Sequence, residues 1–388
     1  MSLKVAIQMD PIELVDIDAD STFRIAEEAQ TRGHDLFYYN PSKLILDHGV
    51  VNAKGCKLKV MREQGNHFEL GREQLVNLND FDVVWLRQDP PFDMGYITYT
   101  HILDRLGPDT LVVNDPFWVR NYPEKLLVLD FPDLTPPTVI ARDINVLKEF
   151  KNKHQDIIIK PLYGNGGAGV FRLGPDDKNI SSLHELFSGI NNEPLIAQKF
   201  LPDVSKGDKR VILVDGKPVG AINRVPAKGE TRSNMHVGGR PEKIELSERD
   251  LEICAKIGPL LKEKGQIFVG IDVIGHWLTE INVTSPTGIQ ELERFNNENI
   301  AGLIWESIET KNTLSDFKKE TIDQIKNVET FGWFAVMYAG MIISIFGHMM
   351  MFYLYKFYSV GVVMPCLLYT SDAADEGLGV DLGGRRII

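Results

Sequence analysis

Apolar runs separated by polar or glycine-rich breaks occupy the first third of the chain. The runs that predict strands lie at residues 3–9, 36–39, 81–86 and 111–122. Between the first two, the amphipathic segment 21–32 predicts a helix that ends at Gly33. Strands that alternate with helices are typical of a parallel sheet with helices on its faces. We therefore predict a Rossmann-like α/β domain over residues 1–122.

The rest of the pattern predicts two smaller parts that mix helices with antiparallel strands. We place a central domain at residues 123–200 and a third part, made of strand hairpins and one helix, at residues 201–310. The helix is predicted at 247–264, because Ser247 is a good N-cap residue and Gly265 a good stop.

A glycine-rich loop in the central domain carries the clearest chemistry. The β-branched run 157–159 predicts a buried strand, and Lys160 stands at its end, where a cation needs an anionic partner. The loop glycines allow backbone N–H groups to approach phosphate oxygens closely. They are Gly164, Gly166, Gly167 and Gly169.

The spacing of this loop satisfies G-x-G-x-x-G, which indicates dinucleotide binding only when a helix follows. Here the apolar run 170–173 follows, and no Gly-Lys-Ser/Thr is present, so the loop is not a Walker A motif. We predict a hairpin flap over a nucleotide, with Lys160 beneath it. Kinases also combine a glycine-rich loop with a lysine on a strand. The alternative is a tight hairpin with a solvated lysine.

Two predicted strands, 268–274 and 277–283, carry hard metal ligands. Because side chains alternate along a strand, Glu280 and Asn282 share one face, and Asp272 on the partner strand could face them. Two carboxylates and an amide oxygen suit Mg²⁺ that is shared with substrate phosphates. The alternative is a hairpin with polar residues on its solvent face.

Arg87 follows the predicted strand 81–86. Ligands of open α/β sheets collect at the carboxyl ends of the strands, so we predict that Arg87 binds a carboxylate. The alternative is a structural ion pair with Asp89 or Asp93.

The segment 226–240 is polar, contains glycines and has no hydrophobic period. Such a long irregular segment inside a compact domain predicts a lid or a binding loop, and disorder without a function is the alternative. The segment 196–202 has backbone groups that could meet an adenine edge.

Composition and charge narrow the classes of function. The 388-residue chain has a net charge of −12, which argues against a general nucleic-acid binder, because no basic face is available to release counterions. The three cysteines, Cys56, Cys254 and Cys366, are far apart and show no C-x-x-C spacing. This pattern fits a reducing cytoplasm and neither a disulfide framework nor a zinc site. The N-terminus passes directly into a strand, without the pattern of a signal peptide.

Taken together, these residues resemble the prokaryotic glutathione synthetases of the ATP-grasp superfamily. The motifs that carry the resemblance run from Met1 to about Glu309 and comprise Lys125, Lys160 with the glycine flap, 208–210, Arg224, 229–232, Asp272 and 279–287. The fold that the resemblance implies is a Rossmann-like N-terminal domain followed by a two-part ATP-grasp fold. The activity that it implies is ATP-dependent ligation of γ-glutamylcysteine to glycine through an acyl phosphate.

The resemblance also implies a role for each matching residue. ATP would be bound by Lys125, Lys160, Gly164, Gly166, Gly167, Gln198, Lys199, Phe200, Leu201 and Asp208. Magnesium, or manganese, would be held by Asp272, Glu280 and Asn282. Arg210 and Arg224 would stabilise the transferring phosphoryl group and the acyl intermediate. The peptide would be bound by Arg87, Arg232, Ser285, Pro286 and Thr287.

The tail after about residue 310 does not match this family. Residues 331–355 predict a hydrophobic, transmembrane-like helix in which His348 is the only ionisable residue besides tyrosines. Residues 326–365 resemble one helix of a multi-span drug/metabolite transporter, and the run from Cys366 resembles translated sequencing-adapter sequence. We therefore expect residues 311–388 to be an unrelated segment of a chimeric reading frame, and we expect membrane association only if that segment is genuine.

Two other functions stay open at this point. One is a different ATP-grasp carboxylate–amine ligase that acts on a peptide, and the other is a nucleotide-binding component of a membrane transporter. For the main interpretation we expect a cytoplasmic enzyme that forms a homo-oligomer and binds no nucleic acid.

Overall fold

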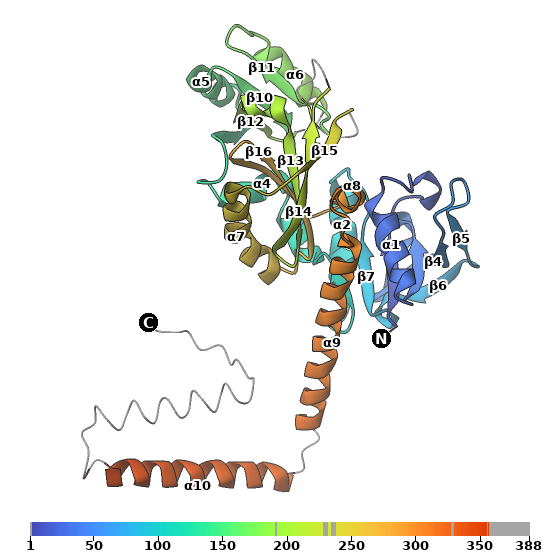
Figure 1. Cartoon of the computed structure of the whole chain (residues 1–388), viewed down its shortest axis with the longest axis vertical. Helices are drawn as coiled ribbons and strands as arrows, with labels where there is room; N and C mark the ends of the chain where they lie inside the picture. The colour runs from blue at the N-terminus through green and yellow to red at the C-terminus, as the bar shows by residue number, and fades with distance from the viewer. Residues whose placement is uncertain are drawn as a thin grey trace. The chain divides into compact units, whose positions relative to one another are not determined.

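The computed structural model describes residues 2–190, 192–227, 232–233, 238–326, 330–354 and 356. The chain divides into two compact units, Met1–Asp316 and Phe317–Ile388. Within the described residues, the first unit contains three β-sheets, which follow one another along the chain (Figure 1).

The first sheet has the strand order β3-β4-β2-β1-β7-β8, and β5 and β6 also pair with β4. Its parallel strands are β1 (Lys4–Gln8), β2 (Asp35–Tyr39), β7 (Val83–Leu86) and β8 (Leu111–Val113). Its antiparallel strands are β3 (Leu44–Asp47), β4 (Val50–Val60), β5 (Phe68–Leu70) and β6 (Gln74–Asn77). The expected α/β arrangement is present, and the carboxyl ends of β1 and β7 lie at one edge, beside Arg87.

Three helices accompany this sheet: α1 (Ser21–Thr31), α2 (Met94–Leu103) and α3 (Pro116–Asn121). The strand predicted at 111–122 is too long, since β8 ends at Val113. The physical reason is local: the Asp115 side chain accepts a hydrogen bond from the N–H of Trp118, and Pro116 occupies the first turn, so a helix begins there.

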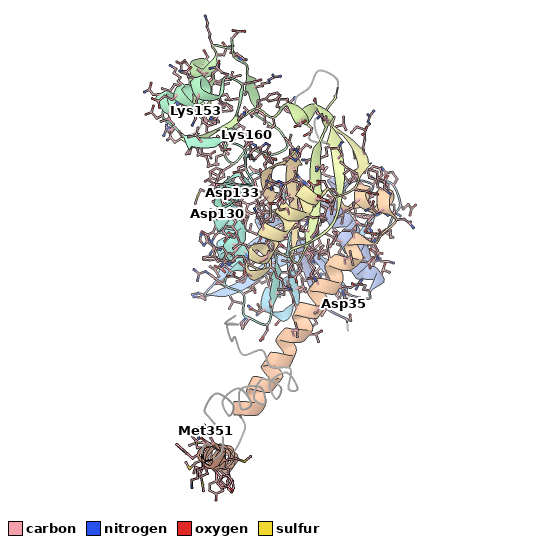
Figure 2. The ribbon with its side chains drawn as sticks, turned by 60° about the vertical axis from the view of Figure 1, so that its left-hand side comes forward. Asp35, Asp130, Asp133, Lys153, Lys160 and Met351 are labelled. Atoms are coloured by element: carbon pink, nitrogen blue, oxygen red, sulfur yellow. The ribbon has the colours of Figure 1, made fainter. Side chains whose placement is uncertain are left out.

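The second sheet has four strands in the order β11-β10-β12-β9. They are β9 (Thr138–Ala141), β10 (Ile157–Pro161), β11 (Phe171–Leu173) and β12 (Leu195–Lys199). Helices α5 (Ile144–His154) and α6 (Ile180–Ile190) place Leu147 and Ile180 in a small apolar core with Ile157, Ile159 and Leu195. This core fixes β10, and therefore Lys160, which Figure 2 labels.

The third sheet has five strands in the order β15-β14-β13-β16-β17. They are β13 (Asp208–Val214), β14 (Lys217–Val225), β15 (Arg240–Ile244), β16 (Phe268–Ile274) and β17 (Trp277–Asn282). Helix α7 (Glu248–Glu263) begins as predicted, because Ser247 and Asp250 form a reciprocal capping box. Gly265, with φ +65°, follows its end.

The remaining helices of the first unit are short, apart from α9. They are α4 (Glu124–Leu127), α8 (Ile289–Asn296) and the 3-10 helices Ile12–Leu14, Pro41–Lys43, Leu78–Asp80, Val128–Asp130 and Pro202–Lys206.

Helix α9 (Ile300–Lys326) begins in the first unit and packs back onto the first sheet and α1. The indole N–H of Trp305 donates to the carbonyl of Ile25 at 2.9 Å. The Glu309 carboxylate accepts from Arg32 Nη1 at 2.8 Å and lies 3.1 Å from His34 Nε2. Residues near 310 therefore stabilise the N-terminal part of the fold.

The second unit contains α10 (Thr330–Leu354), at the place where a hydrophobic helix is predicted. Its apolar sequence is interrupted by polar residues, among them Ser344 and His348. Among the residues that the structure describes, no helix combines the length and the apolarity needed to cross a membrane.

Candidate active site

One face of the five-stranded sheet carries a network of charged side chains. Asp208 and Arg210 lie two residues apart on β13 and so share a face. The strand register pairs Asp208 with Arg224, Arg210 with Asp272, and Asp272 with Glu280. The sequence places these groups on the four strands of two hairpins, β13 with β14 and β16 with β17, and the register between β13 and β16 brings them together.

Asp272 is the centre of this network. Its Oδ1 accepts from Arg210 Nε at 2.5 Å, and its Oδ2 lies 3.0 Å from both Arg210 Nη2 and Arg224 Nη2. Burial opposes the charge on Asp272, but the two guanidinium groups outweigh it and lower the pKa of this carboxyl. Asp272 is therefore a fully ionised acceptor, as a metal ligand must be.

Asp208 lies at the edge of the same network. Its Oδ2 accepts from Arg224 Nη2 at 2.5 Å and from the hydroxyl of Ser233 at 2.9 Å. Burial raises the pKa of Asp208 to about 6, although Arg224 opposes the change. Sequence reasoning missed Ser233, which no motif distinguishes from the rest of its loop.

Two lysines from the central part of the chain reach this face. Lys160 Nζ on β10 donates to Glu280 Oε1 at 2.9 Å, and Lys125 Nζ on α4 lies 3.7 Å from the same oxygen. Lys125 also donates to the carbonyl of Gly164 at 2.5 Å and contacts the carboxylate of Glu124. Burial opposes its charge, but the carboxylates of Glu280 and Glu124 raise the pKa of Lys125. Both lysines predicted to bind phosphates thus lie beside a predicted metal ligand.

The glycine loop connects β10 to β11, which pair antiparallel, so it is a hairpin and no helix follows it. Gly166, Gly167 and Gly169 have positive φ angles of 61°, 80° and 69°. A Cβ on Gly169 would lie 3.0 Å from the Pro161 ring. The loop conformation therefore requires glycine at these positions. Glycine is also what a loop needs to bring its backbone N–H groups close to phosphates.

The predicted metal ligands share this face but are already engaged. Asn282 donates through Nδ2 to the carbonyl of Gly270 at 3.1 Å, which leaves its Oδ1 as a possible ligand. Glu280 is held by the two lysines, which lower its pKa against the effect of burial. Within the described part of the chain, no three His, Cys, Asp or Glu side chains are grouped to hold a metal ion. The donor set of two carboxylates and one amide oxygen nevertheless fits Mg²⁺.

In the segment predicted to meet adenine, several hydrogen-bonding groups already have partners within the protein. The N–H groups of Lys199 and Phe200 donate to the carbonyls of Pro137 and Asp156, at 2.9 and 3.0 Å. The Gln198 amide donates to Thr138 Oγ1 at 3.0 Å. These two N–H groups are therefore not available to a base unless the segment rearranges.

Arg87 is buried at the carboxyl edge of the first sheet, with 3% of its surface exposed. Its Nε donates to Thr22 Oγ1 at 3.0 Å and its Nη2 to the carbonyl of Pro286 at 3.1 Å, while Nη1 has no hydrogen-bond partner among the residues that the structure describes. Burial lowers the pKa of Arg87, against the effect of nearby Asp20 and Asp89. Of the two acids considered as ion-pair partners, Asp93 instead caps α2, whereas Asp89 acts on this arginine electrostatically.

The run 285–287 joins Arg87 to the charged face. The carbonyl of Pro286 accepts from Arg87, and that of Thr287 accepts from Arg210 Nη1 at 3.4 Å. The hydroxyl of Ser285 is buried and has no hydrogen-bond partner in the described part of the chain. Arg232 Nη1 lies 3.5 Å from the carbonyl of Gly167, and the neighbouring residues 228–231 and 234–237 lie outside the described residues.

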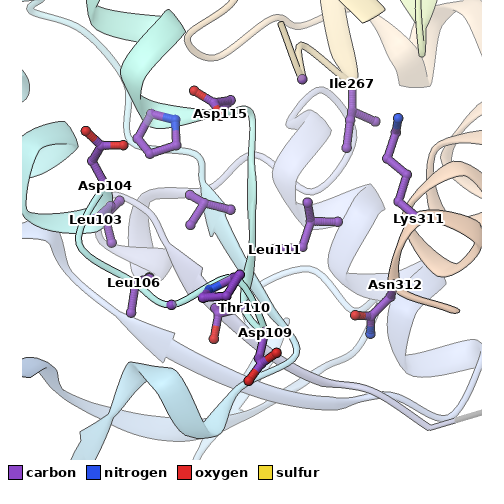
Figure 3. Close-up of a pocket in the computed structure, with 15 residues that line it drawn as sticks. Leu103, Asp104, Leu106, Asp109, Thr110, Leu111, Asp115, Ile267, Lys311 and Asn312 are labelled. Atoms are coloured by element: carbon purple, nitrogen blue, oxygen red, sulfur yellow. The ribbon is translucent and has the colours of Figure 1, made fainter. Parts of the chain in front are cut away.

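A separate cavity of about 280 Å³ lies between α2, β8 and α9 (Figure 3). Three of its charged lining residues already have protein partners. Asp104 pairs with Arg120 at 2.7 Å, Lys311 pairs with Asp215 at 2.7 Å, and Asp115 caps α3. The cavity shares no residue with the charged face.

Comparisons with known proteins agree with the family that the sequence motifs indicate. The family models described as "Prokaryotic glutathione synthetase, N-terminal domain" and "Prokaryotic glutathione synthetase, ATP-grasp domain" match residues 3–120 and 124–297. A protein of Brucella melitensis named glutathione synthetase is 57% identical over 311 residues, which cover 80% of this chain and all of the relative. One of Agrobacterium fabrum with the same name is 56% identical over 313 residues, which cover 81% and 98% of the two chains.

Solved structures share the fold at lower identity. The D-cycloserine synthetase DcsG has a TM-score of 0.58 and 14% identity, over 79% of this chain and 99% of its own. The ATP-grasp ligase PsnB, complexed with a minimal precursor, Mg and ADP, has a TM-score of 0.51 and 18% identity, over 80% and 98%. The predicted ATP-grasp fold is therefore confirmed, and this chain belongs to the prokaryotic glutathione synthetase family.

Proposed function

We propose that the chain ligates γ-glutamylcysteine to glycine with ATP, giving glutathione, ADP and phosphate through an acyl phosphate. The observation that carries this proposal is the meeting of Lys125 and Lys160 with Glu280 beneath the glycine flap, in a chain of this family. Phosphoryl transfer to a carboxylate brings several anions together, and such a site must supply cations at that point.

The residues of the site have the following roles in this proposal. Lys125, Lys160 and the flap glycines bind the ATP phosphates, while Gln198 to Leu201 and Asp208 bind the rest of the nucleotide. Asp272, Glu280 and Asn282 hold Mg²⁺ or Mn²⁺, which neutralises charge on the phosphates when it is bound. Arg210 and Arg224, which converge on Asp272, stabilise the phosphoryl group in transfer and the acyl intermediate.

The peptide substrate binds between the first sheet and the charged face. Arg87 Nη1 and the Ser285 hydroxyl, which have no hydrogen-bond partner within the described residues, are offered to the substrate, the guanidinium to a carboxylate. Pro286, Thr287 and Arg232 complete this side of the site. The chain needs no nucleophilic residue of its own, because ATP activates the carboxylate and the amine of glycine attacks it.

An acyl phosphate must be protected from water. The described residue Ser233 of the segment 226–240 donates to Asp208 inside the network, which supports a role for this segment beside the reacting groups, while residues 228–231 and 234–237 lie outside the described residues. We propose that this loop is a lid over the reacting groups.

We further propose a cytoplasmic homo-oligomer with functional parts at 1–122, 123–200 and 201–310, and a tail at 311–388 without a role in catalysis. The described tail begins within α9, whose first turns pack on the first sheet.

The test is an assay of phosphate release and glutathione formation with a panel of acceptors. We expect both products only when γ-glutamylcysteine and glycine are present together. Release with another peptide or amine would favour a different ATP-grasp ligase. ATP binding without turnover would favour the transporter-component alternative.

A further inference from the structure

Glu124 lies beside Lys125 at the first position of α4 and has no role in the function proposed above. Its carboxylate contacts the ammonium of Lys125 directly. The same ammonium donates to the carbonyl of Gly164, at the base of the flap, and lies 3.7 Å from Glu280 Oε1. Lys160 lies nearer to that oxygen, at 2.9 Å.

The charges in the site explain why a second acid is needed. Two buried ammonium groups, on Lys125 and Lys160, converge on one oxygen of Glu280. Glu124 supplies the second negative charge to this pair. With it, the network holds four cations (Lys125, Lys160, Arg210, Arg224) and four anions (Glu124, Asp208, Asp272, Glu280).

We propose that Glu124 is a positioning residue that keeps Lys125 beside the flap and thereby leaves Glu280 available to the metal. This inference rests on the proposed function, in which Glu280 is a metal ligand. Without the charge of Glu124, the nearest carboxylate to Lys125 is Glu280, and the attraction between two partly buried charges is strong. Lys125 would then compete with the metal for Glu280.

The simplest electrostatic expectation has the same sign. If Glu124 were only a neighbouring negative charge, its removal would weaken binding of a divalent cation to the same extent with and without Lys125. A positioning role requires that removal of Glu124 weaken metal binding, and that this effect depend on Lys125. The two roles can therefore be distinguished without measuring catalysis.

The experiment titrates the purified full-length protein with Mn²⁺, without nucleotide, and follows free Mn²⁺ by electron paramagnetic resonance. We expect Glu124→Gln to weaken Mn²⁺ binding about tenfold, and Glu124→Asp, which keeps the charge, to weaken it by less than about threefold. The control is Glu263→Gln, since Glu263 is exposed and pairs only with its neighbour Lys264 in the described part of the chain. The control should bind Mn²⁺ like the wild type.

A double-mutant cycle decides whether Lys125 transmits the effect. In a Lys125→Met background, Glu124→Gln should no longer weaken Mn²⁺ binding. Unchanged or tighter Mn²⁺ binding in the Glu124→Gln single variant would overturn the inference, and so would an equal loss with and without Lys125. If Glu124→Gln does not fold, a loss of more than tenfold in folded Glu124→Asp would also contradict it. Glutathione formation by the wild type tests the proposed function separately.

Discussion

Lys160 on β10 and Glu280 on β17 form an ion pair, with 2.9 Å between Nζ and Oε1, that joins the four-stranded sheet to the five-stranded sheet. Both groups are assigned to ligands in the proposed function, the lysine to a phosphate and the carboxylate to the metal. The pair must therefore open when both ligands bind. A site that exchanges an internal ion pair for a phosphate and a metal should bind the two together better than either alone.

The metal ligands give the first prediction. Glu280→Gln or Asn282→Ala should lower the rate of glutathione formation by about 100-fold or more. Each change removes a ligand of the metal that stabilises the negative charge developing during phosphoryl transfer. Thermal unfolding should show that both variants fold. The matched control is Glu242→Gln, at a half-buried position on β15 where the carboxylate pairs with Arg240. Near-normal rates in both variants at limiting Mg²⁺ would remove these residues from the metal site.

Arg87 gives the second prediction. Arg87→Lys keeps a positive charge but loses the planar fork that donates to Thr22 and Pro286 and leaves Nη1 for a substrate. We expect the KM for γ-glutamylcysteine to rise about tenfold, with the KM for ATP unchanged. Initial rates over both substrate concentrations measure this. Equal changes in both KM values would indicate that Arg87 supports the fold and does not bind the peptide.

The lid gives the third prediction. Shortening residues 229–238 should raise ATP hydrolysis relative to glutathione formation, because the acyl phosphate would meet water before glycine. Ser233→Ala removes the hydrogen bond to Asp208 and should produce a smaller change of the same kind. The ratio of phosphate to glutathione released is the measurement. Full coupling in the shortened protein would show that the loop is not the barrier.

The sequence predicted the elements that carry the site better than it predicted the remaining sheet. The strands around Asp272 and Glu280 were predictable because their apolar runs are bounded by turn residues, and the helix from Ser247 because its cap is local. Strands β3 to β6 were not predicted, since β3, β5 and β6 are only three or four residues long and β4 mixes buried apolar residues with lysines, an asparagine and a glycine.

The sequence indicated which residues belong to the site more readily than it indicated which of them contact one another. Nothing local indicates that Lys125 and Lys160 share one oxygen of Glu280, since this depends on how two sheets pack. Glu124 was missed because an acid beside a lysine in the chain is common, and its importance comes from burial alone. The ion pairs of the predicted metal ligands with basic side chains could likewise not be read from spacing.

Asp208 gives a prediction about pH. Burial raises its pKa to about 6 from the ordinary value of 3.8, so the folded protein binds this proton more tightly than the unfolded chain does. Its carboxyl therefore favours folding below about pH 4, and this contribution is lost as the pH rises through 6. The free energy of unfolding of the wild type, relative to Asp208→Asn, should fall by up to about 3 kcal/mol between pH 4 and 7.

Urea unfolding of both proteins across this pH range measures the difference. Asp47→Asn, at an exposed position, is the control and should give a curve parallel to that of the wild type. Parallel curves for Asp208→Asn and the wild type would show that the carboxyl does not titrate in this range.

The tail gives the last prediction. Every residue with a proposed role lies between Arg87 and Thr287, and the contacts of α9 with the first unit include Trp305 to Ile25, Glu309 to Arg32 and Lys311 to Asp215. A chain that ends after Asp316 keeps all three. It should therefore be as active per mole as the full chain, and it lacks the exposed apolar residues of α10, such as Met341 and Phe346.

Sedimentation and specific activity of the two forms measure this. We expect the shortened protein to stay in the supernatant and the full chain to sediment or to partition into detergent. A chain that ends after Glu306 is the matched comparison, because it loses the Glu309 carboxylate that Arg32 and His34 contact, and it should unfold at a lower temperature. If the form that ends after Asp316 is folded but inactive while the full chain is active in membranes, the tail is needed for activity and our proposal for it is wrong.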